Sequence, residues 1–237
     1  MPHTIHHGLL ITGTDTEIGK TVLTTALAAY WLNSRSPDSL GLMKLVQSGT
    51  GDFETYTRLF DLAQDELAIA PQRFAAPLAP PLAAAQEGKT VDLTIVWQQL
   101  SQLLDRRQWV LIEALGGLGS PVTDEWTVAD LAAAWHLPIV LVVPIRLGAI
   151  AQAVANAALA RQHQLTVKGI VLNCPTPLTP EQQRHWAPID LIERLTQLPV
   201  LGQMPYLSSV DDLTALTAAA ADLPLEALLP GRLQQAV

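Results

Sequence analysis

The stretch GTDTEIGKT at residues 13–21 directly follows the apolar run LLI at 9–11. Five residues separate Gly13 from Gly19, whereas the usual phosphate-binding loop, or P-loop, has four before its Gly-Lys-Thr. Phosphate binding does not itself require that exact spacing. It requires a strand, a turn with converging N–H groups, a lysine, a hydroxyl, and a helix whose positive end faces the anion. The stretch supplies each of these parts.

The flanking residues support the same interpretation. Residues 8–12 suit a buried strand, and apolar side chains recur at helical spacing through 19–32. Lys20 and Thr21 then fall in the first helical turn. The alternative is a strand–turn–helix unit in which the glycine only turns the chain and the lysine is solvated. We predict a phosphate-binding loop.

Short apolar runs and segments with helical spacing alternate along the rest of the chain. The expected strands are 40–46, 109–113, 139–143, 169–172 and 200–202. The expected helices are 94–104, 128–135, 149–163 and 188–196. This alternation predicts an α/β fold, with a mostly parallel sheet between two layers of helices in one P-loop domain over residues 1–237.

The chain of 237 residues, about half of them apolar, can bury one large core. Its net charge of −8 argues against a nucleic-acid partner. An anionic ligand must then be held by a few local cations, which gives weight to Lys20 and Lys44.

The start MPHTIHHGLL has neither a cationic leader nor a small-residue cleavage site, so we expect no signal peptide and solvated histidines rather than a metal site. The longest apolar stretch, 137–144, is too short to span a membrane, and the single Cys174 cannot form an internal disulfide. We expect a soluble cytoplasmic protein.

The segment at about 71–93 contains several prolines and no periodicity, which predicts a loop. Its small apolar residues suit packing over a site as well as they suit a plain surface loop.

Polar residues follow the strands where ligands bind in parallel sheets, at the carboxyl ends. Magnesium takes oxygen ligands, typically a loop hydroxyl and one or two carboxylates. Thr21 supplies the hydroxyl, and Glu113 closes a strand whose other residues are apolar, where an acid is costly without a role. Asp52 is the second candidate carboxylate, in a polar turn that we expect after the strand at 40–46, and Glu54 in the same turn competes with it.

Three further residues each allow two interpretations. Lys44 either extends to water or faces the loop as a second cation for a transferring phosphoryl group, which we favour. Asn173 either reads an adenine edge or caps a turn, and Cys174 is most simply a small buried residue. Asp15 stands five places before the loop lysine, where partition-type and nitrogenase-type ATPases carry a lysine that reaches across a dimer. A dimer switch built on that lysine is therefore disfavoured.

The loop with its five-residue spacing resembles that of dethiobiotin synthetases. KLVQSG at 44–49 and WVLIEALGG at 109–117 resemble the corresponding motifs of that family, and so, in order, do FAAPLAPPLAAAQEG, PIVLVVPIRLGAI, GIVLN and MPYL. The resemblance covers nearly the whole chain. The first motif is highly specific, and the others gain weight from their order.

The resemblance implies an ATP- and Mg²⁺-dependent ligase that makes dethiobiotin from 7,8-diaminononanoate and CO₂ in biotin synthesis. CO₂ adds to one amine as a carbamate, ATP phosphorylates the carbamate, and the second amine displaces phosphate. It also implies a homodimer with the diamine near the interface.

Carried over by position, the resemblance assigns these roles. The phosphates would contact Thr16, Glu17, Ile18, Gly19, Lys20, Thr21 and Val22, and the following loop Ala114, Leu115 and Gly116. Magnesium would be held by Thr21, Asp52 and Glu113. Lys44, Lys20 and Thr16 would be catalytic, and Ser48 would contact the substrate. Adenine would lie against Asn173, Cys174, Pro205, Tyr206 and Leu207.

Several positions depart from the family pattern: Leu45, Pro81, Ala114, Leu115, Arg146, Ala151 and Gln152. Ala151 and Gln152 lie where the family binds the diamine. The resemblance therefore supports the identity of the substrate less strongly than it supports the use of a nucleotide. Two alternatives remain: a related ATPase or amidoligase acting on another small metabolite, and a nucleotide-binding regulatory protein.

Overall fold

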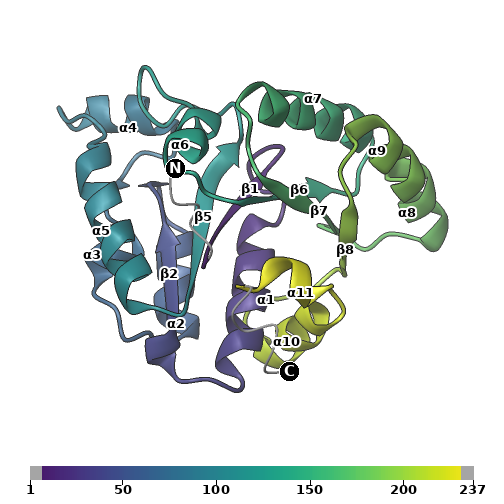
Figure 1. Ribbon diagram of the computed structural model, residues 1–237, viewed down its shortest axis with the longest axis horizontal. Helices are drawn as coiled ribbons and strands as arrows, with labels where there is room; N and C mark the ends of the chain where they lie inside the picture. Colours follow the sequence, from purple (N-terminus) through teal and green to yellow (C-terminus); the bar gives the residue numbers. More distant parts are fainter. Residues whose placement is uncertain (1–6, 231–237) are drawn as a thin grey trace.

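The computed structural model describes residues 7–230. Its centre is a six-stranded sheet in the order β2-β5-β1-β6-β7-β8, and every neighbouring pair is parallel (Figure 1). The strands are β1 (Gly8–Gly13), β2 (Leu40–Lys44), β5 (Trp109–Gly117), β6 (Ile139–Pro144), β7 (Val167–Asn173) and β8 (Val200–Met204). The predicted parallel sheet is confirmed.

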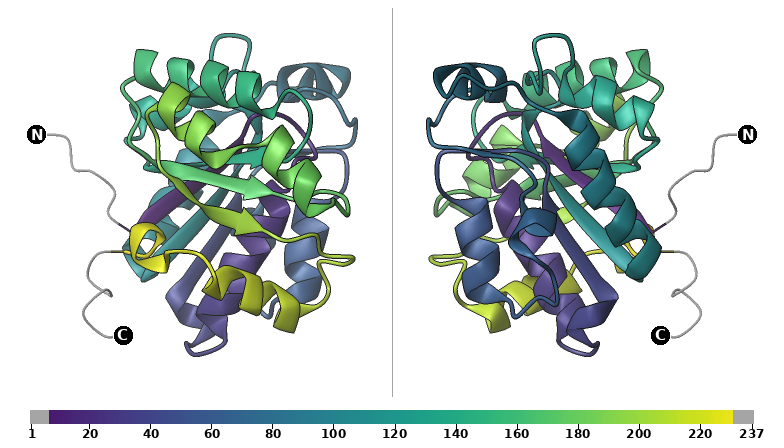
Figure 2. Two further views of the ribbon diagram at one scale, coloured as in Figure 1. Left: turned by 90° about the vertical axis from the view of Figure 1, so that its right-hand side faces the viewer. Right: turned by 90° about the vertical axis from the view of Figure 1, so that its left-hand side faces the viewer.

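Helices cover both faces of the sheet (Figures 1 and 2). One face carries α1 (Lys20–Leu32), α2 (Asp52–Leu59), α10 (Leu213–Ala221) and α11 (Leu225–Leu228). The other carries α5 (Leu93–Arg106), α6 (Val128–Ala134), α7 (Ala149–Gln162) and α9 (Ile189–Thr196). The connections contain η1 (Pro37–Ser39), β3 (Gln47–Ser48), α3 (Glu66–Ile69), β4 (Arg73–Phe74), α4 (Pro80–Gln86) and α8 (Pro180–Trp186).

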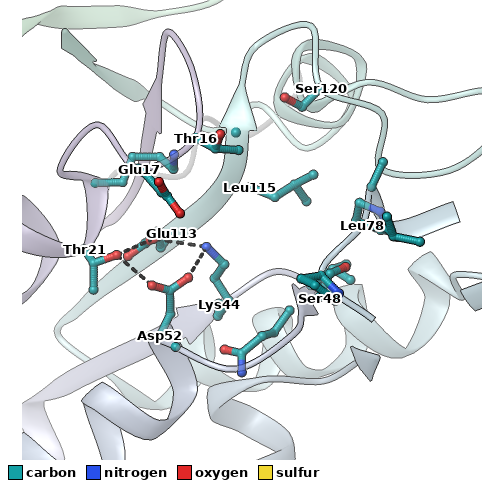
Figure 3. A pocket seen from close by; sticks show the side chains of 18 of the residues that line it. Thr16, Glu17, Thr21, Lys44, Ser48, Asp52, Leu78, Glu113, Leu115 and Ser120 are labelled. Atoms are coloured by element: carbon teal, nitrogen blue, oxygen red, sulfur yellow. Dashed lines mark hydrogen bonds and ion pairs between the residues drawn. The ribbon is translucent and has the colours of Figure 1, made fainter. Parts of the chain in front are cut away.

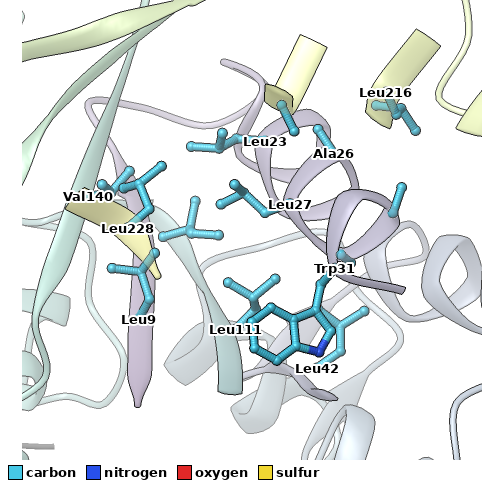
Figure 4. Packing of buried hydrophobic residues seen from close by; sticks show 14 of the residues in the cluster. Leu9, Leu23, Ala26, Leu27, Trp31, Leu42, Leu111, Val140, Leu216 and Leu228 are labelled. Carbon is cyan, nitrogen blue, oxygen red and sulfur yellow. The ribbon is translucent and has the colours of Figure 1, made fainter. Parts of the chain in front are cut away.

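Alternation along the strands divides the core between the two faces, because successive side chains of a strand point to opposite sides. Leu9 joins the cluster under α1, whereas its neighbour Leu10 joins the cluster under α5 and α6. Figure 4 shows Leu23 and Leu27 of α1 directed at the sheet, whose Leu111 and Val140 belong to the same cluster. Each such fully buried leucine contributes about 1.5–3 kcal/mol of transfer free energy. This packing fixes α1, and with it the loop that precedes it.

The strand order places that loop at the topological switch point. β1 lies between β5 and β6, so the chain leaves it in one direction to reach β2 and returns to the other side at β6. Crevices form at the carboxyl ends of strands where the order reverses in this way. The loop at 13–19 occupies that position.

Three local expectations are corrected. The strand expected at 40–46 ends at Lys44, and β3 instead pairs with β4 in a separate two-stranded sheet. The polar turn expected around Asp52 is the start of α2. The loop expected at 71–93 contains α4, whose first two residues are prolines, and a missing N–H costs nothing at those positions.

The N-terminal histidines are only partly described. His3 and His6 lie outside the described residues, and His7 is not simply solvated, since its Nε2 is 2.7 Å from the carbonyl oxygen of Leu104. No helix among residues 7–230 combines the length and the apolar character needed to cross a membrane.

Candidate active site

The phosphate-binding loop is closed by a glycine and braced by a buried amide. Gly19, the N-cap of α1, has φ 99°, and a Cβ there would lie 2.1 Å from Nδ2 of Asn173. That Nδ2 donates a hydrogen bond of 2.9 Å to the carbonyl oxygen of Ile18. Oδ1 of Asn173 is buried and has no hydrogen-bond partner among the described residues. Only glycine fits here, because the conformation and the contact each exclude a side chain.

Lys20 folds back over the loop. Its Nζ donates a hydrogen bond of 2.8 Å to the backbone oxygen of Asp15, and the residue is 6% exposed. Burial lowers the pKa of Lys20 from 10.5 to about 8, against the opposing attraction of Glu113. An anion in the loop would therefore raise the pKa of Lys20 again, because its negative charge favours the ammonium form.

Four side chains, one each from α1, β2, α2 and β5, meet beside the loop (Figure 3). Thr21 donates through Oγ1 to Oδ1 of Asp52 at 2.6 Å and contacts Oε1 of Glu113 at 3.1 Å. The Nζ of Lys44 is 2.5 Å from Oδ2 of Asp52 and 3.0 Å from Oε1 of Glu113. It also donates to the backbone oxygen of Ala114 at 3.0 Å. A single ammonium thus lies between two carboxylates.

The pKa values of the two acids, Asp52 and Glu113, shift in opposite directions. Burial lowers the pKa of Lys44, but Glu113 and then Asp52 outweigh it, so the pKa lies above 10.5 and the ammonium stays charged. Burial raises the pKa of Asp52, yet Lys44 pulls it below 3.8. For the fully buried Glu113, burial dominates and the pKa lies above 4.5, with the like charge of Asp52 adding to the rise. The shared lysine therefore outweighs burial at Asp52 but not at the more deeply buried Glu113.

The donor set fits a hard divalent cation. Thr21, Asp52 and Glu113 present one hydroxyl and two carboxylates, with the hydroxyl in hydrogen-bonding distance of both acids, and such oxygens are the ligands that Mg²⁺ prefers. The competing Glu54 is engaged elsewhere, because its Oε2 accepts from the backbone of Gly51 at 2.7 Å and from Gln47 at 2.9 Å. The geometry favours Asp52 over Glu54.

These residues line a cavity of about 680 Å³. Of the predicted site residues, it brings together Thr16, Glu17, Ile18, Gly19, Lys20, Thr21, Lys44, Ser48, Asp52, Glu113, Leu115 and Gly116. The sequence did not indicate that Gln47, Ser120 and Pro121 also line it. The proline-rich segment contributes Pro77, Leu78, Ala79 and Pro80, so it packs over the site rather than being plain surface.

The other predicted residues are not in the lining. Ala114 contributes only its carbonyl oxygen, to Lys44, and Val22 packs against the core cluster under α1. Cys174 is buried and donates its backbone N–H to Met204 at 3.1 Å. Of the residues predicted to contact adenine, Asn173 is the last residue of β7, and residues 205–207 directly follow β8. Tyr206 is 43% exposed.

Tyr56 belongs to the site and was missed from the sequence. Its side chain is fully buried, and its hydroxyl donates a hydrogen bond to Oε2 of Glu113. Burial and then the two carboxylates raise the pKa of Tyr56 well above 10, so the hydroxyl keeps its proton. The available signal was the four-residue spacing from Asp52, which puts both side chains on one face of a helix. That signal was lost when the stretch was interpreted as a turn.

Asp15 and Arg146 form an ion pair, and each stands where related proteins usually have another residue. Asp15, which replaces the signature lysine, accepts a hydrogen bond of 3.0 Å from Arg146 in the loop before α7. Arg146 also lies 3.4 Å from Oε1 of Gln152. The contact joins the phosphate-binding loop to the segment before α7.

Comparison with known proteins gives consistent matches. A family model described as an AAA domain matches residues 7–214. The ATP-dependent dethiobiotin synthetase BioD of Gloeothece citriformis is 60% identical over 94% of this chain and 98% of its own length. The protein of the same name from Crocosphaera subtropica is 54% identical over 93% and 98%, and BioD 1 of Escherichia coli K12 is 33% identical over 84% and 90%.

Solved structures agree on the fold. A ParA family ATPase from Chlorobium tepidum superposes with a TM-score of 0.59 at 13% identity, covering 94% of this chain and 97% of that one. The cell division ATPase MinD of Pyrococcus furiosus gives 0.54 at 13%, over 92% and 98%. At these identities the likeness concerns the fold alone. The sequence relationships are much closer, and on them this chain belongs to the family of ATP-dependent dethiobiotin synthetases.

Proposed function

We propose that the protein is an ATP-dependent dethiobiotin synthetase that closes a ureido ring on 7,8-diaminononanoate. CO₂ adds to one amine nitrogen, which loses a proton to give a carbamate. A carbamate oxygen attacks the γ-phosphorus of ATP, and ADP leaves. The second amine nitrogen attacks the carbonyl carbon of the mixed anhydride, phosphate leaves, and the nitrogen loses its proton.

The observation that carries this proposal is the pair of buried lysines, Lys20 and Lys44, at one cavity with Thr21, Asp52 and Glu113. Carbamate and phosphoryl groups are both anionic, so transfer between them requires concentrated positive charge in a water-poor site. Lys20 would bind the phosphates, and Lys44 would neutralise the charge that develops between carbamate and γ-phosphate. The substrate amine is itself the nucleophile, so no nucleophilic side chain is required.

Magnesium would be held by Thr21, Asp52 and Glu113. When bound, it would neutralise the negative charge of the phosphates during transfer. The support is the chemistry of this donor set, one hydroxyl that contacts both carboxylates.

The substrates would divide the site. We place the phosphates on residues 16–21 with Gly116, and the diamine near Ser48. The buried Oγ of Ser48 lacks a hydrogen-bond partner among residues 7–230, which suits a contact with substrate. Adenine would lie against Asn173 and residues 205–207, where the unpartnered Oδ1 of Asn173 is an available acceptor.

A cytoplasmic homodimer, with the diamine near the interface, is part of the same proposal. Its support is Leu147, in the loop before α7, which is 85% exposed and follows Arg146. An apolar side chain so exposed beside a ligand-binding loop is consistent with a partner surface.

The test is phosphate release from MgATP in bicarbonate buffer, with and without 7,8-diaminononanoate. The diamine is expected to stimulate release in step with dethiobiotin formation, and Lys44→Ala is expected to lose about 10²–10³-fold of this rate. The matched control is Lys89→Ala, because Lys89 forms an exposed pair with Glu87. ATP binding without any response to the diamine would leave the nucleotide site standing and reject the substrate.

A further inference from the structure

The two carboxylate oxygens of Glu113 are bound by different parts of the protein. Oε1 contacts Thr21 at 3.1 Å and Lys44 at 3.0 Å, and both of these residues line the cavity. Oε2 accepts a hydrogen bond from the hydroxyl of Tyr56. Glu113 is 1% exposed and Tyr56 is fully buried, so neither group exchanges this bond for one to water.

The contact also joins two elements that carry the proposed metal ligands. Tyr56 lies one turn after Asp52 on α2, whereas Glu113 lies on β5. Phe53 and Tyr56 are the buried residues of α2. The phenol is thus a polar link through which α2 holds the carboxylate of β5.

We propose that Tyr56 is a positioning residue for the metal site: by holding Oε2, it keeps Oε1 of Glu113 directed at the space shared with Thr21 and Asp52. Without the phenol hydroxyl, the carboxylate is free to rotate about its last torsion, and a buried acceptor loses its partner. Groups that hydrogen-bond metal ligands orient them in this way, and their loss typically costs 10–100-fold in metal affinity. The inference rests on the proposed function only in taking Glu113 as a metal ligand.

The rival explanation is that Tyr56 only fills the core between α2 and the sheet. Tyr56→Phe separates the two, because it keeps the ring and its packing and removes one oxygen. A purely packing role predicts unchanged metal binding in this variant. Tyr30→Phe is the matched control, since Tyr30 is a half-buried residue on α1 that contacts the same core cluster.

The experiment measures ADP binding by calorimetry with excess EDTA and again across a Mg²⁺ titration, so that no turnover is involved. We expect Tyr56→Phe to keep the ADP affinity in EDTA within about twofold of the parent value. The Mg²⁺ concentration that gives half of the Mg²⁺-dependent change in ADP affinity should rise by about 10–100-fold. Tyr30→Phe should match the parent protein. In a Glu113→Ala background, Tyr56→Phe should add nothing, because the group it positions is gone.

An unchanged Mg²⁺ requirement in Tyr56→Phe overturns the proposal, and so does an equal further loss in the Glu113→Ala background. A parent protein whose ADP binding does not respond to Mg²⁺ overturns it as well. Thermal unfolding of each variant, followed by circular dichroism, distinguishes these outcomes from misfolding. The readout contains no diamine, so the substrate assignment and the role of Tyr56 fail separately.

Discussion

The Nζ of Lys44 lies 3.0 Å from Oε1 of Glu113, and the two residues are direct partners in the register of β2 against β5. Both are almost fully buried. Breaking such a pair is costly, because the remaining charge stays in a poorly solvated place. The pair therefore links the stability of the fold to the charge balance of the site.

Replacing Lys44 by Met should destabilise the protein as well as inactivate it. The variant leaves Asp52 and Glu113 without their shared cation, and we expect a loss of about 3 kcal/mol, the low end for a buried pair, since the Asp52 side chain is 23% exposed. Urea unfolding measures this change. Mg²⁺ with ADP should stabilise the variant more than the parent, because a cation restores the balance. A variant as stable as Lys89→Met would contradict the prediction.

Removing the Thr21 hydroxyl should affect the metal rather than the fold. Thr21→Val keeps the shape of the side chain but loses the oxygen that contacts Asp52 and Glu113. We expect ADP binding in EDTA to persist in Thr21→Val. The increase in ADP affinity on adding Mg²⁺ should fall by at least about tenfold, and Thr21→Ser should retain most of this increase. Equal losses in the serine and valine variants would show that the hydroxyl is not a ligand.

Nucleotide binding should weaken as the pH rises past the pKa of Lys20. Burial lowers that pKa to about 8 in the free protein, and a bound phosphate raises it again, so binding takes up a proton above pH 8. Mg²⁺-free ADP affinity should be flat below pH 8 and fall by up to about tenfold per pH unit above it. Lys20→Arg, which keeps its charge, should bind with no such slope. A slope that persists in Lys20→Arg would assign the proton to another group.

Replacing Ser48 by Ala should act on the diamine alone. Ser48 lines the cavity, and its buried Oγ has no hydrogen-bond partner within the described part of the chain. One lost hydrogen bond of about 0.5–1.5 kcal/mol predicts a rise of up to about tenfold in KM for the diamine, with ADP affinity unchanged. Ser34→Ala, at an exposed position, is the control. A change in ADP affinity instead would move Ser48 to the nucleotide side.

The sequence by itself determined the six strands of the main sheet, the five longer helices α1, α5, α6, α7 and α9, and the loop that leads into α1. Local signals were enough there, because a short apolar run, a glycine turn and a helical repeat each report on neighbouring residues. Glu113 was also found locally, as an acid that ends an apolar run.

The tertiary structure decided how the site is assembled. The pairing of Lys44 with Glu113 depends on strand register across 69 residues of sequence, and no local pattern specifies it. Tyr56 was hidden for the same reason, and so the sequence left open whether the proline segment covers a site or is plain surface, since long-range burial holds α2 and α4 in place. The adenine contacts at 205–207 stay a prediction, because a ligand's position depends on groups that converge from separate strands. Sequence thus specified the parts of the site, and burial against the sheet determined which of them meet.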